Sequence, residues 1–260
     1  MKRYSALLVV ACLLAGTAHA DLKIVSEVDA TGMGAMADGR TVTYLKGLKM
    51  RTDSDAKGTD TMILDIEKKQ MVVLNAKKKR AEVYDMSGVA EQQVNIQTGE
   101  VSLEATGNTR TVAGFDCEEH NISMSFEAGA PAMPNVEIEV SMAGPVCLSK
   151  DAPGADEFAK FYAAMADSGL FFAPPQAAQA QPGQQRGITN LYRAMTEKGV
   201  GLASDLEVGF SGSGMIAKMM KRLGTTTSTE VIEISDETLS DDLFEIPAGY
   251  KVKNQTLSVK

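Results

Sequence analysis

Short apolar stretches alternate with polar, lysine-rich turns from Thr41 to Met86. This spacing is typical of consecutive antiparallel strands joined by hairpins. It predicts strands over residues 22–28, 41–45, 48–53, 61–66, 70–75 and 80–86. We interpret the lysines between them as solvated hairpin tips, which discourage edge-to-edge pairing. A basic patch that steers a ligand is the alternative for these lysines.

Shorter and more interrupted apolar patterns follow in the rest of the chain. They predict a short strand over 100–103 and longer strands over 118–126, 136–142, 200–210 and 227–234. Residues 110–112 lead into the strand over 118–126, and 243–247 close the domain. Strand 200–210 has a clear period of two, which places Leu206 and Val208 on its apolar face. Segments rich in glycine or proline predict loops over 31–39 and 127–134. The pattern leaves 88–99 open between a loop and a short helix, and 215–223 open between a turn and a strand.

Two segments change to a helical period. Residues 155–168 carry an apolar stripe made of Phe158, Phe161, Tyr162 and Met165. Residues 188–198 carry a second stripe made of Leu191, Tyr192 and Met195, and Gly199 ends that helix. Between them, residues 174–186 are rich in Pro, Gln and Ala, and we interpret them as a flexible insertion. The chain is therefore predicted to be mainly β with two helices, an α+β fold, in one domain over 21–260.

The first residues resemble an export signal rather than part of the fold. Lys2 and Arg3 precede an apolar core, and Ala18-His19-Ala20 has the small-x-small pattern of a leader-peptidase site. We expect residues 1–20 to be a signal peptide and the protein to be periplasmic, with outer-membrane association or secretion as alternatives. A competing interpretation takes residues 9–12 as a lipobox with Cys12 as a lipid anchor. The apolar stretch is too short to span a membrane.

The net charge of the chain limits the kinds of molecule that we expect it to bind. The formal net charge is −8, and removal of a leader with two basic and no acidic residues makes it more negative. Nucleic acids and anionic lipid surfaces attract basic proteins, so we expect neither as a partner.

Two cysteines, Cys117 and Cys147, remain after the leader. An even pair in an exported chain predicts a disulfide, here between two neighbouring strands. Two separate buried thiols are the alternative.

No catalytic or metal-binding pattern stands out. His120 is the single histidine after the leader, and we expect it at the surface or on an edge strand, because a zinc site needs three or four spaced ligands. Gly209-Phe210-Ser211-Gly212 departs from the G-x-S-x-G nucleophile elbow. The 15 methionines suggest adaptable packing or a cavity for apolar guests, with copper(I) ligation as an alternative. We therefore expect no enzyme, metal or cofactor; a hydrolase using Asp, Glu or a lone Ser is the minor alternative.

Three segments are similar to a family of exported bacterial proteins known as domain of unknown function 4412. The similar segments are residues 40–86, including Tyr44–Arg51 and Met71–Leu74, then Thr111–Cys117 (T-V-A-G-F-D-C) and Leu243–Tyr250 (L-F-E-I-P-A-G-Y). That family looks related to the periplasmic lipoprotein-carrier fold, a curved antiparallel half-barrel whose concave face is covered by helices. Cys147 and the 174–186 insertion depart from the family pattern. The resemblance carries no catalytic residues.

These observations favour a binding protein. We expect an apolar concave face to hold a lipid, an acyl chain or a lipidated protein. The predicted cover and wall residues are Phe158, Phe161, Tyr162, Met165, Leu191, Met195, Leu206 and Val208. The alternative is an envelope interaction protein with a filled core and no ligand.

Overall fold

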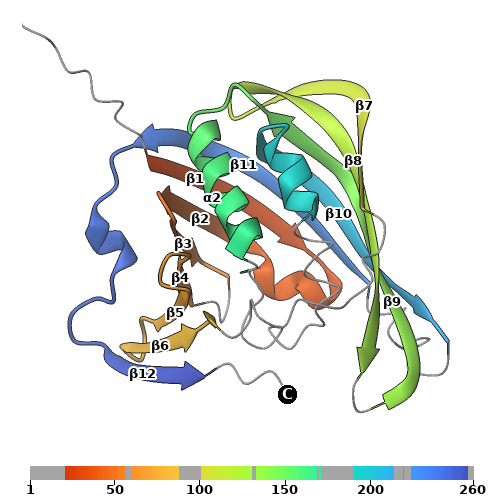
Figure 1. Cartoon of the computed structure of the whole chain (residues 1–260). Helices are drawn as coiled ribbons and strands as arrows, with labels where there is room; N and C mark the ends of the chain where they lie inside the picture. Colours follow the sequence, from red (N-terminus) through yellow and green to blue (C-terminus); the bar gives the residue numbers. More distant parts are fainter. Residues whose placement is uncertain are drawn as a thin grey trace, which may run out of the picture.

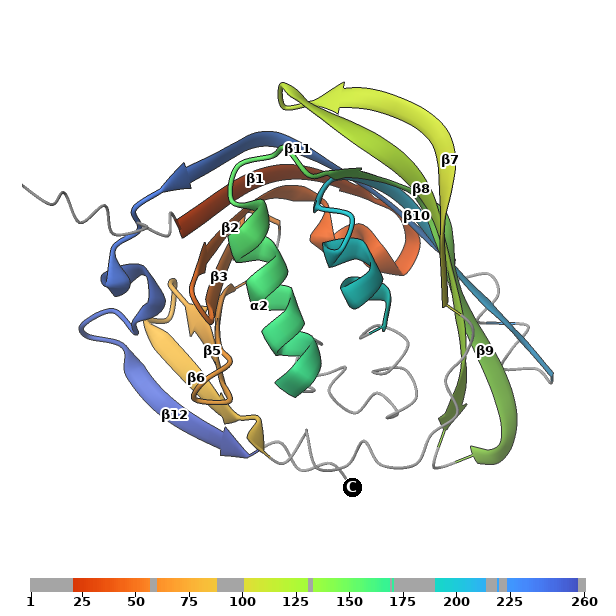
Figure 2. The same cartoon turned by 45° about the horizontal axis from the view of Figure 1, so that its top comes forward.

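A computed structural model describes residues 21–56, 60–87, 101–130, 133–168, 170, 190–213, 219 and 224–256. Its strands form one 12-stranded sheet in the order β12-β6-β5-β4-β3-β2-β1-β11-β10-β9-β8-β7 (Figure 1). The sheet is open, with β12 and β7 at its two edges, and it curves around the helices (Figure 2).

The first part of the sheet is the predicted meander. It consists of β1 (Asp21–Ala30), β2 (Gly39–Lys46), β3 (Lys49–Ser54), β4 (Thr61–Asp65), β5 (Gln70–Asn75) and β6 (Arg80–Asp85). One row of directly opposed apolar side chains crosses five of these strands: Leu22, Leu45, Met50, Leu64 and Met71. All five are buried and belong to the main core, so the face that carries them is the inner face of the sheet.

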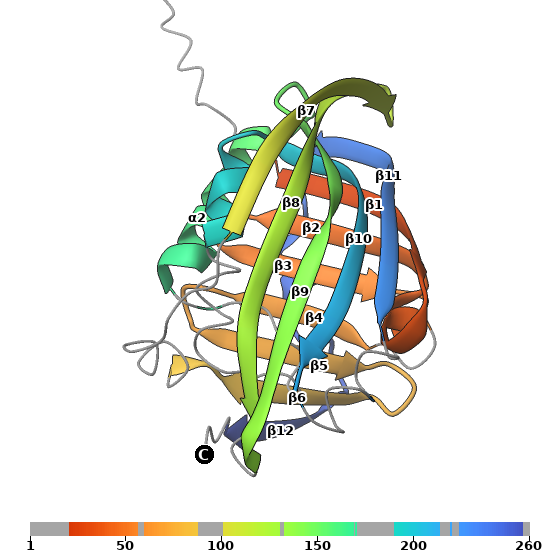
Figure 3. The ribbon, with the colours of Figure 1, turned by 90° about the vertical axis from the view of Figure 1, so that its right-hand side faces the viewer.

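The second part consists of longer strands: β7 (Val101–Val112), β8 (Phe115–Ala130), β9 (Met133–Ser149), β10 (Val200–Gly212) and β11 (Thr225–Glu237). The four strands β7–β10 lie side by side and cross in front of the meander in Figure 3. The short strand predicted over 100–103 is the start of β7, which runs on to Val112 with an irregularity between Ala105 and Thr109.

The loop predicted over 127–134 is also wrong. β8 continues to Ala130 and β9 begins at Met133, so residues 127–130 and Met133 pair within the β8–β9 ladder. Extension of the β8–β9 ladder overrides the local preference for a turn. Similarly, the predicted 31–39 loop contains a 3-10 helix, η1 (Gly32–Ala37).

The helix α2 (Ala155–Ser168) has the predicted bounds. It lies inside the curve of the sheet beside a second helical segment, residues 190–196 (Figure 2). Phe161 and Met165 of α2 are buried in the same core as Leu22 and Leu45. The first turn of α2 is also fixed to the sheet, because buried Glu157 accepts a hydrogen bond from the backbone N–H of Gly47 at 2.5 Å.

The C-terminal segment packs on the outer face of the meander. Leu239 and Phe244 form a separate apolar cluster with residues of β4–β6, and η3 (Asp241–Phe244) lies within this segment. The chain ends its described part in β12 (Lys251–Thr256), which pairs with β6 in parallel. The predicted sheet was antiparallel throughout, so this parallel edge strand is a correction.

Lys46, at one of the predicted hairpin tips, bonds to other parts of the protein and is not exposed to solvent alone. The Lys46 ammonium donates to the carbonyl of Leu239 at 2.6 Å and lies 3.0 Å from the Asp241 carboxylate and 3.7 Å from that of Asp21. Asp21 in turn accepts from the backbone N–H of Leu239. Lys46 therefore ties the first strand to the C-terminal segment.

Several predictions fall outside the described residues. These are the leader over 1–20, the 174–186 insertion, the 88–99 segment and most of 215–223.

Among the described residues, no helix has the length and apolar character needed to cross a membrane.

Candidate functional site

The inner face of β7–β10 carries a second apolar cluster, separate from the main core. Its buried members are Ile122, Val146, Leu148 and Leu191, and the first three come from β8 and β9. Leu191 comes from the helical segment 190–196, which places that segment against the inner face of the long strands. The Met195 side chain reaches the same place, with its methyl group 4.0 Å from where a side chain on Gly201 would begin.

The strand register aligns further apolar side chains across the inner face of β7–β10. Val101, Met124, Met142 and Val208 lie directly opposite one another across β7, β8, β9 and β10. Leu103 is opposite Ile122 in the neighbouring row, and Leu206 lies on the same face of β10. We call Val101, Leu103, Met142, Leu206 and Val208 the inner-wall patch. All five are only half-buried, in contrast to the fully packed row under α2.

The two helical segments contact each other above the sheet. The rings of Tyr162 and Tyr192 are stacked, with centroids 5.0 Å apart and an angle of 4° between their planes. Arg193 donates to the Asp167 carboxylate at 2.6 Å. Burial raises the pKa of the Tyr162 hydroxyl, and the Tyr192 hydroxyl adds to this effect; burial also raises the pKa of Tyr192. The two helical segments that were predicted to cover the sheet are thus held together by an aromatic stack and an ion pair.

The predicted cover residues of α2 lie in the interior. Phe158, Phe161 and Met165 are buried against the main core, and Tyr162 is half-buried beside Phe158 and Tyr192. Their contacts in this structure are with the protein itself. A role in holding a ligand stays a prediction for these four residues.

The predicted wall residues and the second helix do come together. Leu191, Met195 and Leu206 share one cluster, and Val208 lies one inner-face position beyond Leu206 on β10. Sequence patterns missed Val101, Leu103 and Met142 as companions of these residues. Val101 and Leu103 were predicted only as part of a short strand over 100–103. Met142 was likewise assigned to a strand, and none of the three was assigned to a site.

His120 is not at the surface, and its strand is not an edge strand, so that prediction is wrong. Its exposed fraction is 3%, and it lies on the inner face of β8 opposite Val146. Its Nδ1 is 3.1 Å from the carbonyl oxygen of Glu118. Ile122, Met124 and Phe126 alternate with Asn121, Ser123 and Ser125, and this period of two places His120 on the apolar face of the strand. The prediction gave more weight to the two glutamates before His120.

The predicted disulfide between Cys117 and Cys147 is confirmed, with Cα atoms 5.3 Å apart. It joins β8 to β9, and both cysteines are buried. A pocket of about 280 Å³ lies beside it and is lined by Thr109, Asp116, Cys117, Glu118, Leu148, Lys150, Asp151 and Lys198. Because its charged groups have both signs, this pocket indicates no single class of ligand.

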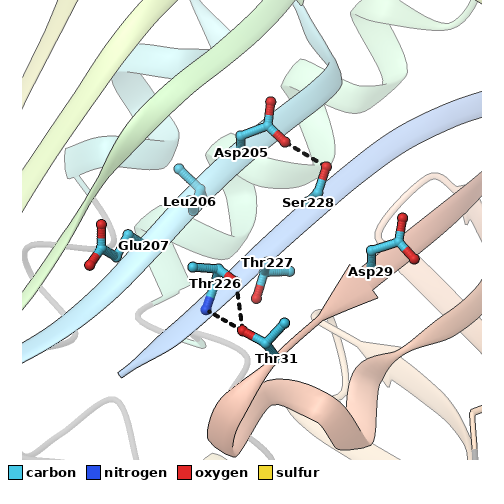
Figure 4. Close-up of a pocket in the computed structure, with 8 residues that line it drawn as sticks. All are labelled: Asp29, Thr31, Asp205, Leu206, Glu207, Thr226, Thr227 and Ser228. Atoms are coloured by element: carbon cyan, nitrogen blue, oxygen red, sulfur yellow. Dashed lines mark hydrogen bonds between the residues drawn. The ribbon is translucent and has the colours of Figure 1, made fainter. Parts of the chain in front are cut away.

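A second pocket, of about 270 Å³, lies on the outer face of β1, β11 and β10 (Figure 4). Asp29, Asp205 and Glu207 contribute carboxylates to it. Asp205 accepts a hydrogen bond from Ser228, and the Thr31 and Thr226 hydroxyls are 2.6 Å apart. Within the described part of the chain, no group of three or more His, Cys, Asp or Glu side chains is arranged to hold a metal ion.

Comparisons with known proteins found a family model that is similar to part of the chain. A family model described as a domain of unknown function, DUF4412, matches residues 32–141, which run from η1 into β9. No curated protein matches the chain. Among solved structures, PNGF-II in a C2 space group aligns with a TM-score of 0.36 and 9% sequence identity. That alignment covers 91% of this chain but only 31% of the PNGF-II chain.

Proposed function

We propose that this protein is an exported, periplasmic binding protein that holds the acyl chain of a lipid or of a lipidated protein against the inner-wall patch. The observation that carries the proposal is the contrast between the two halves of the inner face. Under α2 the face is packed with buried side chains, whereas the inner-wall patch is apolar and only half-buried. Half-buried apolar side chains that are clustered on a concave wall favour an apolar ligand.

The dimensions of the patch suit a single chain. Neighbouring strands lie about 4.8 Å apart, so the row from Val101 on β7 to Val208 on β10 spans roughly 14 Å. Met142 stands in this row, and its flexible thioether adapts to guests of different shape. Leu191 and Met195 would flank the guest from the helical side.

The acyl-chain guest is motivated by the resemblance, drawn from the sequence, to a family that looks related to the lipoprotein-carrier fold. The guest proposed here contacts Leu206 and Val208, as the sequence analysis predicts, together with Val101, Leu103 and Met142. Phe158, Phe161 and Met165 would support the wall indirectly, because they fix α2 to the sheet.

A titration with a fluorescent fatty-acyl probe tests this proposal. We expect saturable binding to the wild-type protein and at least a tenfold loss of affinity in Leu206→Asp and Val208→Asp, because a carboxylate on the patch must be desolvated by the guest. The matched control is Glu207→Gln, which lies between the two residues on β10 but on the outer face, and it should bind like the wild type.

Two results would contradict the proposal. One is a lack of saturable probe binding by a folded wild-type protein. The other is equal binding by wild type and both aspartate variants, which would place the probe elsewhere. In either case the envelope interaction protein with a filled core becomes the better account, since the packing under α2 already fits it.

A further inference from the structure

We infer that His120 is the polar anchor of the inner wall and binds a hydroxyl or amide N–H at the head of the acyl guest. This inference rests on the proposed function and names the chemical class of its ligand. His120 stands two residues before Ile122 on β8, so the two side chains share the inner face and lie about 7 Å apart along the strand. Leu103 of the inner-wall patch is directly opposite Ile122.

The imidazole ring is nearly buried but not closed off. The exposed fraction of His120 as a whole residue is 3%. Among the described residues, every fully buried side-chain nitrogen or oxygen has a hydrogen-bond partner. The only bond formed by the ring among these residues is through Nδ1. It follows that Nε2 keeps some accessible surface. Ala105, directly opposite on β7, is exposed, so the wall is open on that side of the ring.

The partner of Nδ1 determines what Nε2 can bind. The Glu118 carbonyl oxygen can only accept a hydrogen bond, so Nδ1 carries the proton and donates to it. In a neutral imidazole, Nε2 is then an acceptor without a proton. A buried acceptor next to an apolar wall favours a ligand that brings its own donor on an apolar chain. Fatty alcohols, monoacylglycerols and N-acyl amides have this chemistry, whereas alkyl ethers and alkanes do not.

A comparison of dodecanol with dodecyl methyl ether, by competition against the fluorescent acyl probe, tests the inference. Wild type should bind the alcohol roughly five- to tenfold more tightly, the effect of about one hydrogen bond to a sheltered acceptor. In His120→Phe this preference should vanish while ether binding is retained. In His120→Gln it should persist in part, because the Gln side chain again offers an acceptor. Asn121→Ala, an exposed change on the outer face of the same strand, should keep the preference.

The nitrogen resonances of His120 give an independent readout on the unmodified protein, which covers the case that the variants fail to fold. Dodecanol should shift the Nε2 resonance and leave Nδ1 protonated, and the ether should not. Equal affinity for alcohol and ether, together with an unmoved Nε2 resonance, would overturn the anchor while leaving the acyl-binding function intact. Failure of both compounds and of the probe to bind would instead overturn the proposed function.

Discussion

At the scale of single residues, a few polar side chains determine how the apolar interior is closed. Asp21 is buried at the start of β1 and accepts from the backbone of Leu239, so the first strand and the C-terminal segment are joined at one carboxylate. Glu157 likewise joins α2 to the β2–β3 turn, because its carboxylate accepts a hydrogen bond from the Gly47 amide. Buried polar groups are costly unless they are bonded, and these two are bonded at junctions between elements.

The disulfide is expected to contribute substantially to stability. Its cysteines are separated by 30 residues, and a loop of this size restricts the unfolded chain by about 3–4 kcal/mol. The double variant Cys117→Ala/Cys147→Ala should lose roughly that free energy of unfolding in a urea titration, and wild type under reducing conditions should match it. A loss below about 1 kcal/mol would mean that the unfolded chain is restricted by other means.

Alkaline pH should destabilise the helical cover through its tyrosines. Burial raises the pKa of both Tyr162 and Tyr192, so the folded protein holds these phenolic protons more tightly than the unfolded chain does. Their stabilising contribution is complete below about pH 10, the ordinary tyrosine pKa, and is lost as the pH rises through the folded-state values.

The double variant Tyr162→Phe/Tyr192→Phe tests this pH dependence. Its free energy of unfolding should decline less steeply above pH 10 than that of wild type. At pH 8 both tyrosines are neutral in folded and unfolded protein, so the two slopes with pH should agree there. Parallel curves across the alkaline range would contradict the assignment.

At the scale of elements, the sequence predicts what is local and misses what depends on long-range pairing. The strands of the meander lie within a few residues of their predicted bounds, and α2 has the predicted ones, because a period of two or of 3.6 is visible within each segment. β7, β8 and β9 were predicted too short, since Gly, Ala and Pro near 127–134 suggest a loop unless the partner strand is known. β12 was missed because Val252 is the only apolar residue in it and its pairing with β6 is parallel and distant.

The residues of the candidate site also divide into those that the local period predicts and those that depend on strand pairing. Leu206, Val208, Leu191 and Met195 were predictable from period alone, and they do share one side of the sheet. Val101 and Leu103 became part of the site only through the register of β7 with β8. The burial of His120 was predictable, because it shares a face of its strand with Ile122, Met124 and Phe126.

The packing of α2 gives a prediction at this scale. Phe161 is fully buried between the helix and the sheet, so Phe161→Ala should lower the free energy of unfolding by about 3–5 kcal/mol. Ala163→Gln on the exposed side of the same helix is the control and should change it by less than about 0.5 kcal/mol. A small effect of Phe161→Ala in thermal or chemical unfolding would show that α2 is not part of the cooperative core.

At the scale of the whole molecule, one open curved sheet serves two purposes. The β1–β6 half is covered on its inner face by α2 and on its outer face by the C-terminal segment, so it forms a two-sided core. The β7–β10 half is covered on its inner face by residues 190–196 and keeps the inner-wall patch half-buried. The proposed binding function uses the first half as the packed frame and the half-buried patch of the second half as the surface for the guest.

Photo-crosslinking with an acyl chain that carries a diazirine, followed by peptide mass spectrometry, tests this central claim most directly. We predict labels on the inner face of β7–β10 and on residues 190–196, at or next to Leu206, Val208, Met142 and Met195. These labels should decrease when unlabelled dodecanol competes. Labels confined to the outer face, or labelling that competitor leaves unchanged, would contradict the claim that this wall binds an acyl chain.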